Sequence, residues 1–243
     1  MGWWQRLRPG GREVPPGTPL AALAAAPVPD PGTPLDLVEL LAMDLETTGL
    51  NPRREELLSF GMVLVRGGQV HLATARHLPV RPRGQVGDSA VVHGLTDDSL
   101  AQEPPLKEVL PQVLEALVSG APLPGTDQGV APRRVLLAHF AHVETAFLAA
   151  ASRQVYGAAV GVPVVDTLEL ARGLLRSQNQ ELQAGTVRLD ACRRRHRLPR
   201  YRAHSAITDA LACAELFLAQ TAELERTHGR PLTLGDVQER GLR

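Results

Sequence analysis

The sequence contains almost no lysine, few cysteines and no excess of charge of either sign, and each shortage excludes something. Lys107 is the one lysine among 26 basic residues in a chain of 243, which we interpret as the coding bias of a GC-rich genome. Acidic residues also number 26, so the formal net charge of zero excludes a whole-protein field that would attract a polyanion from a distance. Cys192 and Cys213 lack the spacing of a metal site, which indicates free thiols in a reducing compartment.

Long apolar runs are also missing. None approaches the ~20 residues that a membrane span requires. The run at residues 21–26 follows a basic N-terminus but is too short, and too closely flanked by proline, for a signal peptide. The length suits one domain with extensions, or at most two small domains. We therefore expect a cytoplasmic protein that makes no contact with a membrane.

Proline is concentrated near the N-terminus. Because prolines at this density disfavour regular helices and strands, we expect residues 1–35 to form an extended or mobile N-terminal extension. Trp3 and Trp4 lie inside it, and we expect them to fold back on the chain's own domain; docking on a partner or on a membrane surface is the alternative. Residues 226–243 are expected to form a C-terminal tail, which leaves residues 36–225 as the main domain.

Two carboxylates mark the stretch around which the chain is organised. The apolar residues 37–43 predict a mostly buried strand, and Asp44 and Glu46 at its end would point to the same face. The turn Thr47-Thr48-Gly49 then exposes that end to solvent and ligands. Buried, unpaired carboxylates are costly, and a hard divalent cation such as Mg²⁺ or Mn²⁺ removes the cost. A solvated strand end is the alternative interpretation.

The remaining pattern predicts a mixed α/β domain. Residues 57–65 and 69–80 predict two strands joined by a hairpin turn at Gly67-Gly68, so that the first three strands form an antiparallel meander. Residues 135–138 predict a fourth strand. Residues 162–168 predict a fifth, apolar enough to be central in a parallel part of the sheet. Between these strands, Thr96 is expected to cap a short helix, residues 106–118 to form a helix that contains Pro111, and residues 120–134 to form a surface loop.

Two further segments carry candidate functional residues. Asp166 ends the fifth strand; a helix cap is the expected role, and a carboxylate of the site is the alternative. His204 and Asp209 are five residues apart, which places them ~140° apart in a continuous helix. They converge if Ser205 is the N-cap and His204 lies on the preceding loop; a solvated loop histidine is the alternative. The arginine-rich residues 187–202 favour either phosphate contacts or a solvated helix face.

The sequence Asp-Leu-Glu-Thr-Thr-Gly-Leu at residues 44–50 resembles the first motif of the DEDDh 3′–5′ exonucleases. This is the DnaQ-like family, which includes the proofreading epsilon subunit of a bacterial replicative polymerase. Residues 204–210 match the third motif of that family, His-x-Ala-x-x-Asp-Ala, at every fixed position. The segment His93-Gly94-Leu95-Thr96 is similar to one that the family uses near the scissile end, although a loop and helix cap is its ordinary meaning.

The second motif is matched less well. Residues 139–148 resemble the pattern His-Asn-Ala-x-Phe-Asp, but Phe140 replaces Asn, Val143 replaces Phe and Glu144 replaces Asp. Glu144 keeps the carboxylate and adds a methylene group, so it must enter the site from farther away. The alternative for Glu144 is an exposed position on an amphipathic helix.

The resemblance implies a ribonuclease H-like three-layer α/β/α fold with a mixed five-stranded sheet. It also implies two Mg²⁺ or Mn²⁺ ions held by Asp44, Glu46, Glu144 and Asp209. His204 would accept a proton from the attacking water. Contacts with the substrate would come from Thr47, Thr48, Leu50, His93 and Phe140.

The implied activity is a metal-dependent 3′–5′ exonuclease that releases 5′-mononucleotides from single-stranded 3′ ends of DNA or RNA. One alternative is the same chemistry in a proofreading-type subunit, docked to a polymerase or another replication or repair partner. A second is a weakly active or non-catalytic module that binds nucleic-acid ends; the intact residues Asp44, Glu46, His204 and Asp209 argue against it. Discrimination between DNA and RNA depends on pocket shape and does not follow from the sequence.

Overall fold

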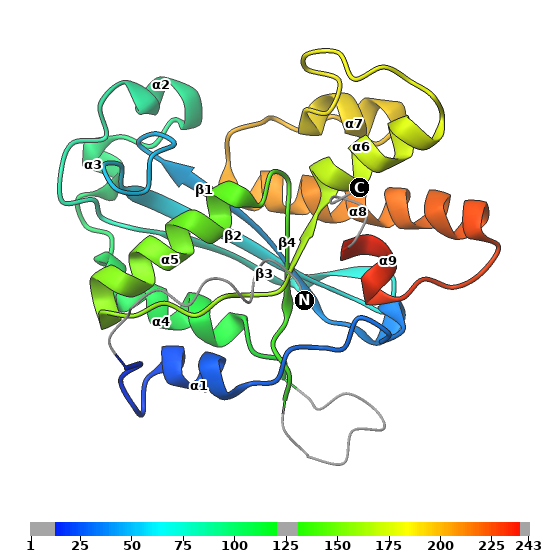
Figure 1. The fold of residues 1–243 in the computed structure, drawn as a ribbon. Coiled ribbons are helices and arrows are strands. Elements are labelled where there is room, and N and C mark those ends of the chain that lie inside the picture. The colour runs from blue at the N-terminus through cyan, green and yellow to red at the C-terminus, as the bar shows by residue number, and fades with distance from the viewer. Residues whose placement is uncertain (1–12, 121–130, 239–243) are drawn as a thin grey trace.

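The computed structural model describes residues 13–120 and 131–238, so Trp3, Trp4 and most of the predicted loop at 120–134 lie outside it. Within the described residues, a five-stranded mixed sheet has the order β3-β2-β1-β4-β5 (Figure 1). The strands are β1 (Leu40–Thr47), β2 (Leu57–Arg66), β3 (Gln69–Pro79), β4 (Val135–Ala138) and β5 (Val164–Asp166). β1, β2 and β3 pair antiparallel, and β1, β4 and β5 pair parallel. The predicted fold class and the meander are confirmed.

Helices cover both faces of the sheet, with α1, α4 and α5 on one side and α8 across the other (Figure 1). The helices are α1 (Pro19–Ala25), α2 (Ala90–His93), α3 (Asp97–Leu100), α4 (Leu106–Ala116), α5 (His142–Tyr156), α6 (Thr167–Ser177), α7 (Leu189–Arg195), α8 (Ala206–His228) and α9 (Leu234–Gln238), with short 3-10 helices at Leu35–Leu37 and Gly87–Ser89. None of the helices in the described ranges is long and apolar enough to cross a membrane.

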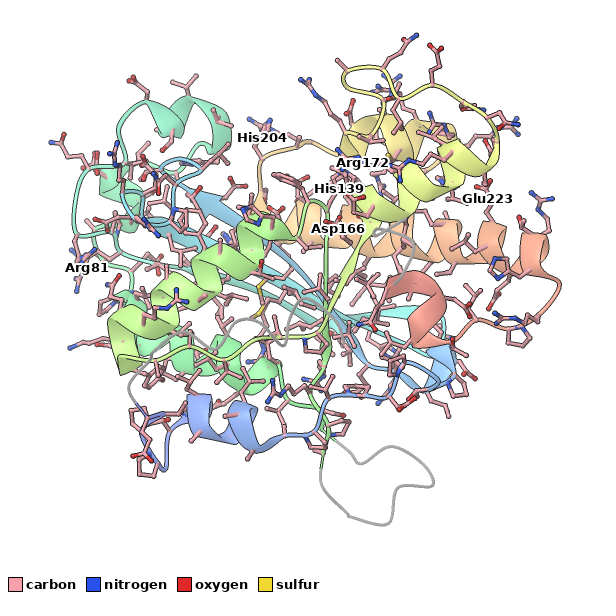
Figure 2. All side chains as sticks on the ribbon, in the orientation of Figure 1. Arg81, His139, Asp166, Arg172, His204 and Glu223 are labelled. Carbon is pink, nitrogen blue, oxygen red and sulfur yellow. The ribbon has the colours of Figure 1, made fainter. Side chains whose placement is uncertain are left out.

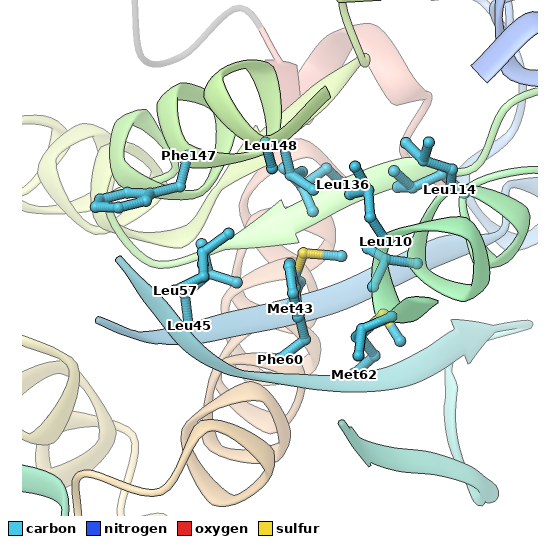
Figure 3. Packing of buried hydrophobic residues seen from close by; sticks show 14 of the residues in the cluster. Met43, Leu45, Leu57, Phe60, Met62, Leu110, Leu114, Leu136, Phe147 and Leu148 are labelled. Carbon is cyan, nitrogen blue, oxygen red and sulfur yellow. The ribbon is translucent and has the colours of Figure 1, made fainter. Parts of the chain in front are cut away.

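The central strand β1 contributes side chains to two hydrophobic clusters, because its side chains alternate between the two faces of the sheet. Met43 and Leu45 belong to the cluster under α4 and α5, where Figure 3 shows Leu110 and Phe147 packed close by. Residues 40 and 42 point the other way, into the cluster under α8. Asp44 and Glu46 continue this second series. The alternation therefore directs both carboxylates to the face that α8 covers.

The N-terminal segment differs from the prediction. We expected residues 1–35 to be extended or mobile, but within the described part of this segment Pro19–Ala25 forms a helix whose Leu20 and Leu23 are fully buried in the core. The helix begins where proline is tolerated: Pro19 occupies the first turn, and the hydroxyl of Thr18 accepts the N–H of Ala21 at 3.2 Å. The high proline content of residues 1–35 therefore did not predict this helix, because the helix contains no proline after its first residue.

The position of β5 was also predicted wrongly. We expected a central strand, whereas β5 is a three-residue edge strand. Its apolar character has another cause, since Val165 is buried in the core under α6 and α8. The short helix α9 lies beside this edge, and the side-chain amide of Gln238 donates to the carbonyl of Val164 at 3.3 Å. Such a cover protects an edge strand from pairing with another chain.

Several local predictions are confirmed. Gly67 and Gly68 form the hairpin turn with φ of +57° and +67°, values that glycine adopts without strain. Thr96 caps α3 in a reciprocal capping box with Ser99. Helix α4 begins at Leu106, as predicted, and accommodates Pro111 in its interior.

Candidate metal centre and active site

Two carboxylates project from the end of β1 toward α8. Asp44 lies opposite Gly61 of β2, and Glu46 lies opposite Ser59. β2 pairs with β1 through both of these positions, whereas β4 pairs only with residues 40–42, so it is the ladder with β2 that holds the backbone of the two carboxylates. Glu46 is 8% exposed, so the pair stands at the boundary between core and solvent.

Gly61 allows the start of α8 to pack directly on the sheet. A Cβ atom at this position would lie 2.0 Å from the carbonyl carbon of Ala206 and 2.2 Å from the nitrogen of Ile207. Any side chain would therefore force the helix away from the strand. Asp209 belongs to the first turn of α8, so this close approach is what carries its carboxylate to Asp44.

Three carboxylates meet at this point. Oxygen atoms of Asp44, Glu46 and Asp209 all lie within 4.8 Å of one another. Burial, together with the charges of neighbouring carboxylates, raises the pKa of Asp44 well above its usual range, and burial and Asp209 raise the pKa of Glu46 to about 7. Hard oxygen donors held this close, at such an electrostatic cost, fit a divalent cation. The metal predicted from the strand end therefore has a suitable donor set.

Glu144 lies beside this cluster, in the first turn of α5. It is 4% exposed, and its Oε2 atom has no hydrogen-bond partner in the described structure. Burial raises the pKa of Glu144 to about 8, and its charge in turn raises the pKa of Asp44. Glu144 is thus buried, not exposed on a helix surface, although it stays outside the group of three. A buried carboxylate oxygen without a partner calls for a cation or a bridging water.

Asp166 is fully used in hydrogen bonds to the backbone. Its carboxylate accepts the N–H groups of Phe140, Ala141 and Leu168, each at 2.9 Å. The predicted cap of α6 is confirmed, and the same side chain also fixes the loop that leads into α5. With these three bonds, Asp166 supports the start of α5, where Glu144 lies.

His204 lies on the loop that precedes α8 (Figure 2), outside the helix that carries Asp209. Its side chain is exposed and its φ is +66°. The backbone N–H of His204 donates to Oδ2 of Asp209 at 2.8 Å, and Ser205 occupies the N-cap position. The predicted helix start is confirmed, and the two motif residues are tied together through this bond.

His93, at the end of α2, approaches the same loop. Burial lowers the pKa of His93, and its electrostatic interaction with His204 lowers it further. Its Nδ1 accepts the N–H of Leu95 at 3.1 Å, so the proton of the neutral ring resides on Nε2. In the described part of the chain, that Nε2 is buried without a partner. His93, which we predicted to contact the substrate, thus has one N–H donor without a partner in the described structure, near His204.

The hydroxyl groups predicted to contact substrate are used inside the turn after β1. Thr47 donates to the carbonyl of Gly49 at 2.7 Å, and Thr48 donates to Oε2 of Glu55 at 2.7 Å. These bonds shape the turn that presents Leu50, whose side chain is 77% exposed. Both threonine hydroxyls thus donate their protons within the turn, and their predicted contact with substrate stays a prediction.

Phe140 is a second exposed apolar side chain at the same edge of the sheet. It follows β4, which runs parallel to β1, so its loop and the turn of Leu50 both leave the carboxyl ends of their strands. The ring is 47% exposed and φ is +72°, a conformation that few residues other than glycine adopt. The hydrogen bond from its N–H to Asp166 holds this backbone in place.

A buried anchor beside the histidine loop was not predicted. The guanidinium of Arg193 donates to the carbonyls of Ala212 (2.6 Å) and Pro199 (2.8 Å) and to Oε2 of Glu215 (2.8 Å). The ring of Tyr201 stacks over it, 4.6 Å from the centroid, and the Tyr201 hydroxyl donates to Oε1 of Glu215 at 2.7 Å. In the sequence, Arg193 is one member of an arginine run, and nothing but its place next to an apolar residue marks it as inward-facing.

The raised pKa values predict how stability depends on pH when metal is absent. Glu46 and Glu144 have folded-state pKa values of about 7 and about 8, above their ordinary 4.5. The folded state therefore binds more protons than the unfolded state between these limits, so its stability falls as the pH rises. We expect the metal-free protein to melt several degrees lower at pH 8 than at pH 6.

Saturating Mn²⁺ should raise the melting temperature at pH 8 by about 5 to 10 °C, because a ligand that binds only the folded state stabilises it. Thermal melting in EDTA and in Mn²⁺ at the two pH values measures both effects. A melting temperature that is the same at pH 6 and pH 8 in EDTA would contradict the assignment of these buried carboxylates.

The sequence model of a family described as Exonuclease (RNase_T) matches residues 41–217. The PolC-type DNA polymerase III of Thermotoga maritima is 28% identical over 179 residues, 73% of this chain but 11% of that protein. The DNA polymerase III epsilon subunit of Haemophilus influenzae is 28% identical over 194 residues, 74% of this chain and 66% of the subunit. The chain thus spans about a tenth of the length of the PolC-type polymerases that it matches.

Solved structures show the same fold. E. coli ExoI in a zinc-bound complex with single-stranded DNA superposes with a TM-score of 0.65 at 12% identity, over 79% of this chain and 42% of that one. Exonuclease X in complex with 5′ overhanging duplex DNA gives a TM-score of 0.55 at 18% identity, over 83% of this chain and 99% of that one. At these identities the likenesses concern the fold alone.

Proposed function

Because the chain belongs to the DnaQ-like exonuclease family and is therefore a nuclease, we propose that it removes 5′-mononucleotides from the 3′ ends of DNA or RNA. One observation carries the proposal. The carboxylate oxygens of Asp44, Glu46 and Asp209 meet within 4.8 Å, with buried Glu144 and exposed His204 beside them. Single-stranded ends are the proposed substrates.

The four carboxylates would hold two divalent cations, Mg²⁺ or Mn²⁺. Asp44 is central to the set, since Glu46, Asp209 and Glu144 all act on its pKa. When bound, the cations supply Lewis-acid stabilisation of the phosphate and lower the pKa of the attacking water. Glu144 would take part through its unpartnered Oε2, directly or through a bridging water.

His204 would accept the proton of the attacking water on one of its ring nitrogens. Its ring makes no hydrogen bond to another residue in the two described ranges, so both nitrogens are available. The backbone bond to Asp209 keeps the loop at the carboxylate cluster while the side chain reaches outward. This placement separates the base from the groups that would hold the cations.

The exposed side chains around the cluster would contact the terminal nucleotides. Leu50 and Phe140 offer apolar surface for bases. The Nε2–H of His93 has no partner in the described structure but is buried, so it would donate to a phosphate or sugar oxygen only after a local movement that exposes it. Thr47 and Thr48 would contribute through the backbone of their turn, because their hydroxyls are already used. These contacts do not distinguish deoxyribose from ribose, so that discrimination would depend on the shape of the pocket around the terminal sugar.

Digestion of 5′-labelled single-stranded DNA and RNA oligomers tests the function directly. We expect a ladder of shortened, 5′-labelled products with Mg²⁺ or Mn²⁺ and none with EDTA. Internal cleavage, or full activity in EDTA, would overturn the proposal. Binding without any shortening of either oligomer would favour the non-catalytic alternative, a module that recognises strand ends.

His204 is expected to govern the rate more than binding. His204→Ala should lower kcat by about 100-fold or more, the usual loss on removal of a general base, with KM little changed. The adjacent exposed residue supplies a control, since Ala203→Gly alters the same loop without removing the ring. Steady-state kinetics on a labelled oligomer measure both parameters. An unchanged kcat would remove His204 from the mechanism.

A second candidate keeps this chemistry in a subunit docked to a polymerase. It is favoured by the relatives named as epsilon subunits of DNA polymerase III. The division into residues 1–35, 36–225 and 226–243 stays a prediction, but α1 and α9 pack on the central domain, so deletion of all 35 N-terminal residues would also remove core. A pull-down of the replicative polymerase by the full chain and by a chain that lacks residues 1–12 is the sharper test.

A further inference from the structure

Positive charge is concentrated in one segment of a chain that is otherwise balanced. Residues 191–208 contain six arginines and no aspartate or glutamate, while the formal net charge of the chain is zero. The segment covers the end of α7, the loop that follows and the start of α8. Such a local excess creates a field at this surface that the net charge does not reveal.

Two of these six arginines make ion pairs within the protein. Arg193 is the buried anchor and is paired with Glu215 at 2.8 Å. Arg194 is paired with Asp190 on the same helix. In the described structure, the other four have exposed side chains and make no ion pair. They are Arg195, Arg197, Arg200 and Arg202.

The loop that carries these free arginines is held in place. The carbonyl of Pro199 accepts a hydrogen bond from Arg193 at 2.8 Å, and Tyr201 is fixed by its stacking on Arg193 and its bond to Glu215. Arg200 therefore lies between two anchored residues. A surface that is ordered before binding loses less conformational entropy when a ligand arrives.

The same loop leads directly to the active site. Arg202 and Arg200 precede His204 by two and four residues, so their Cα atoms lie within about 7 and 14 Å of it. The exposed arginines therefore lie close enough to contact a ligand that extends beyond His204. Guanidinium groups match phosphate oxygens in a planar, two-point geometry, which makes a phosphodiester backbone the fitting partner for such a row.

We propose that Arg195, Arg197, Arg200 and Arg202 form a phosphate-binding surface for the part of a single strand just upstream of its 3′ end. The inference rests on the proposed function and deepens it. The surface holds the strand while the carboxylate cluster takes the terminal nucleotide. The reaction on the last phosphodiester bond itself does not use these arginines.

The test compares binding by the wild type and by Arg200→Ala/Arg202→Ala. A labelled single-stranded oligomer of about 10 nucleotides, within the range that such surfaces cover, is titrated in EDTA, which prevents turnover. We expect about tenfold weaker binding at about 50 mM salt, and a plot of log Kd against log salt whose slope is lower by about 1.4, because each lost phosphate contact on a single strand contributes about 0.7.

A matched variant removes the same charge elsewhere. Arg153 and Arg226 are exposed in the last turns of α5 and α8, and Arg226 is about 30 Å along α8 from Ala206. Arg153→Ala/Arg226→Ala should leave the affinity and the salt slope at the wild-type values. An equal loss in this control, or an unchanged slope in the Arg200/Arg202 variant, would overturn the proposal.

A short substrate separates this proposal from the function on which it rests. The p-nitrophenyl ester of thymidine 5′-monophosphate has no upstream nucleotides, so its hydrolysis by the Arg200/Arg202 variant should stay within about twofold of wild type. A parallel loss on the ester would contradict an upstream role. If the wild type hydrolyses neither ester nor oligomer, the proposed function fails, while the salt slope still reports on the surface.

Discussion

Glu144→Ala should lower kcat for shortening of a single-stranded oligomer by more than about 100-fold, because even an outer partner of a metal ligand typically contributes about 10- to 100-fold. The physical reason is the buried Oε2, which has no hydrogen-bond partner among the described residues, on a side chain whose charge acts on Asp44. Glu144→Asp should retain a measurable part of the activity, since it keeps the charge and merely shortens its reach. Steady-state rates in Mn²⁺ should decrease from wild type to Glu144→Asp and again to Glu144→Ala.

The metal-free stability of Glu144→Gln provides an independent readout. Burial raises the pKa of Glu144 to about 8, so holding it ionised at pH 8 destabilises the fold. The neutral glutamine keeps the shape and removes that cost. We therefore expect the variant to melt at a higher temperature than wild type in EDTA at pH 8. The advantage should shrink toward pH 6, where the wild-type carboxyl is protonated.

Asp166→Ala is the matched control for the second motif. It removes a cap of three backbone N–H groups, and a lost cap typically costs about 1 kcal/mol, so its main effect should be a lower melting temperature. Activity measured well below that temperature should fall less than in Glu144→Ala. A wild-type rate for Glu144→Ala, with a folded but inactive Asp166→Ala, would mean that Asp166 supplies the fourth carboxylate.

Gly61→Ala should disable the protein by separating α8 from the sheet. The added Cβ would lie 2.0 Å from a backbone atom of Ala206, which has no rotamer with which to move away. Overpacking typically costs about 1–3 kcal/mol, and a backbone obstacle places this case at the upper end. For a chain of this size we expect the melting temperature to fall by about 6 to 12 °C.

The rate should fall as well, because displacement of α8 withdraws Asp209 from Asp44 and Glu46. Thermal melting and the rate on a labelled oligomer measure the two effects. Gly161→Ala is the control, since a Cβ there meets nothing within 4 Å and the backbone angle is ordinary. An unchanged melting temperature and rate for Gly61→Ala would show that the helix accommodates the methyl group, and would contradict the mechanism of assembly described above.

Periodicity and local motifs predicted the parts of the fold that depend on nearby residues. The placement of Asp44 and Glu46 on one face followed from the two-residue repeat of a strand. The position of Ser205 at the helix start followed from the need to bring His204 and Asp209 together. Both inferences use geometry within a few residues, where the sequence is most informative.

What was predicted wrongly, or missed, depends on packing between distant segments. The edge position of β5 depends on which strands pair. An equally apolar sequence would also be expected in a central strand, so the sequence does not distinguish the two positions. Gly61 was visible as a glycine inside an apolar strand, a known sign of close approach, but its neighbour Ala206 is far away in the chain. The burial of Arg193 likewise depends on Glu215, on another helix.

The close contact between Gly61 and the start of α8 has a consequence for biosynthesis. β1 and β2 are made before Asp209, which follows only after β3, β4, β5 and the helices from α2 to α7 have been made. Contacts between such distant parts of a chain form late in folding, because the intervening loop must first be closed. A nascent or truncated chain that ends before α8 lacks Asp209, which belongs to the first turn of that helix. We therefore expect nuclease activity to arise only after α8 has been made, so that shorter products leave the cell's nucleic acids intact.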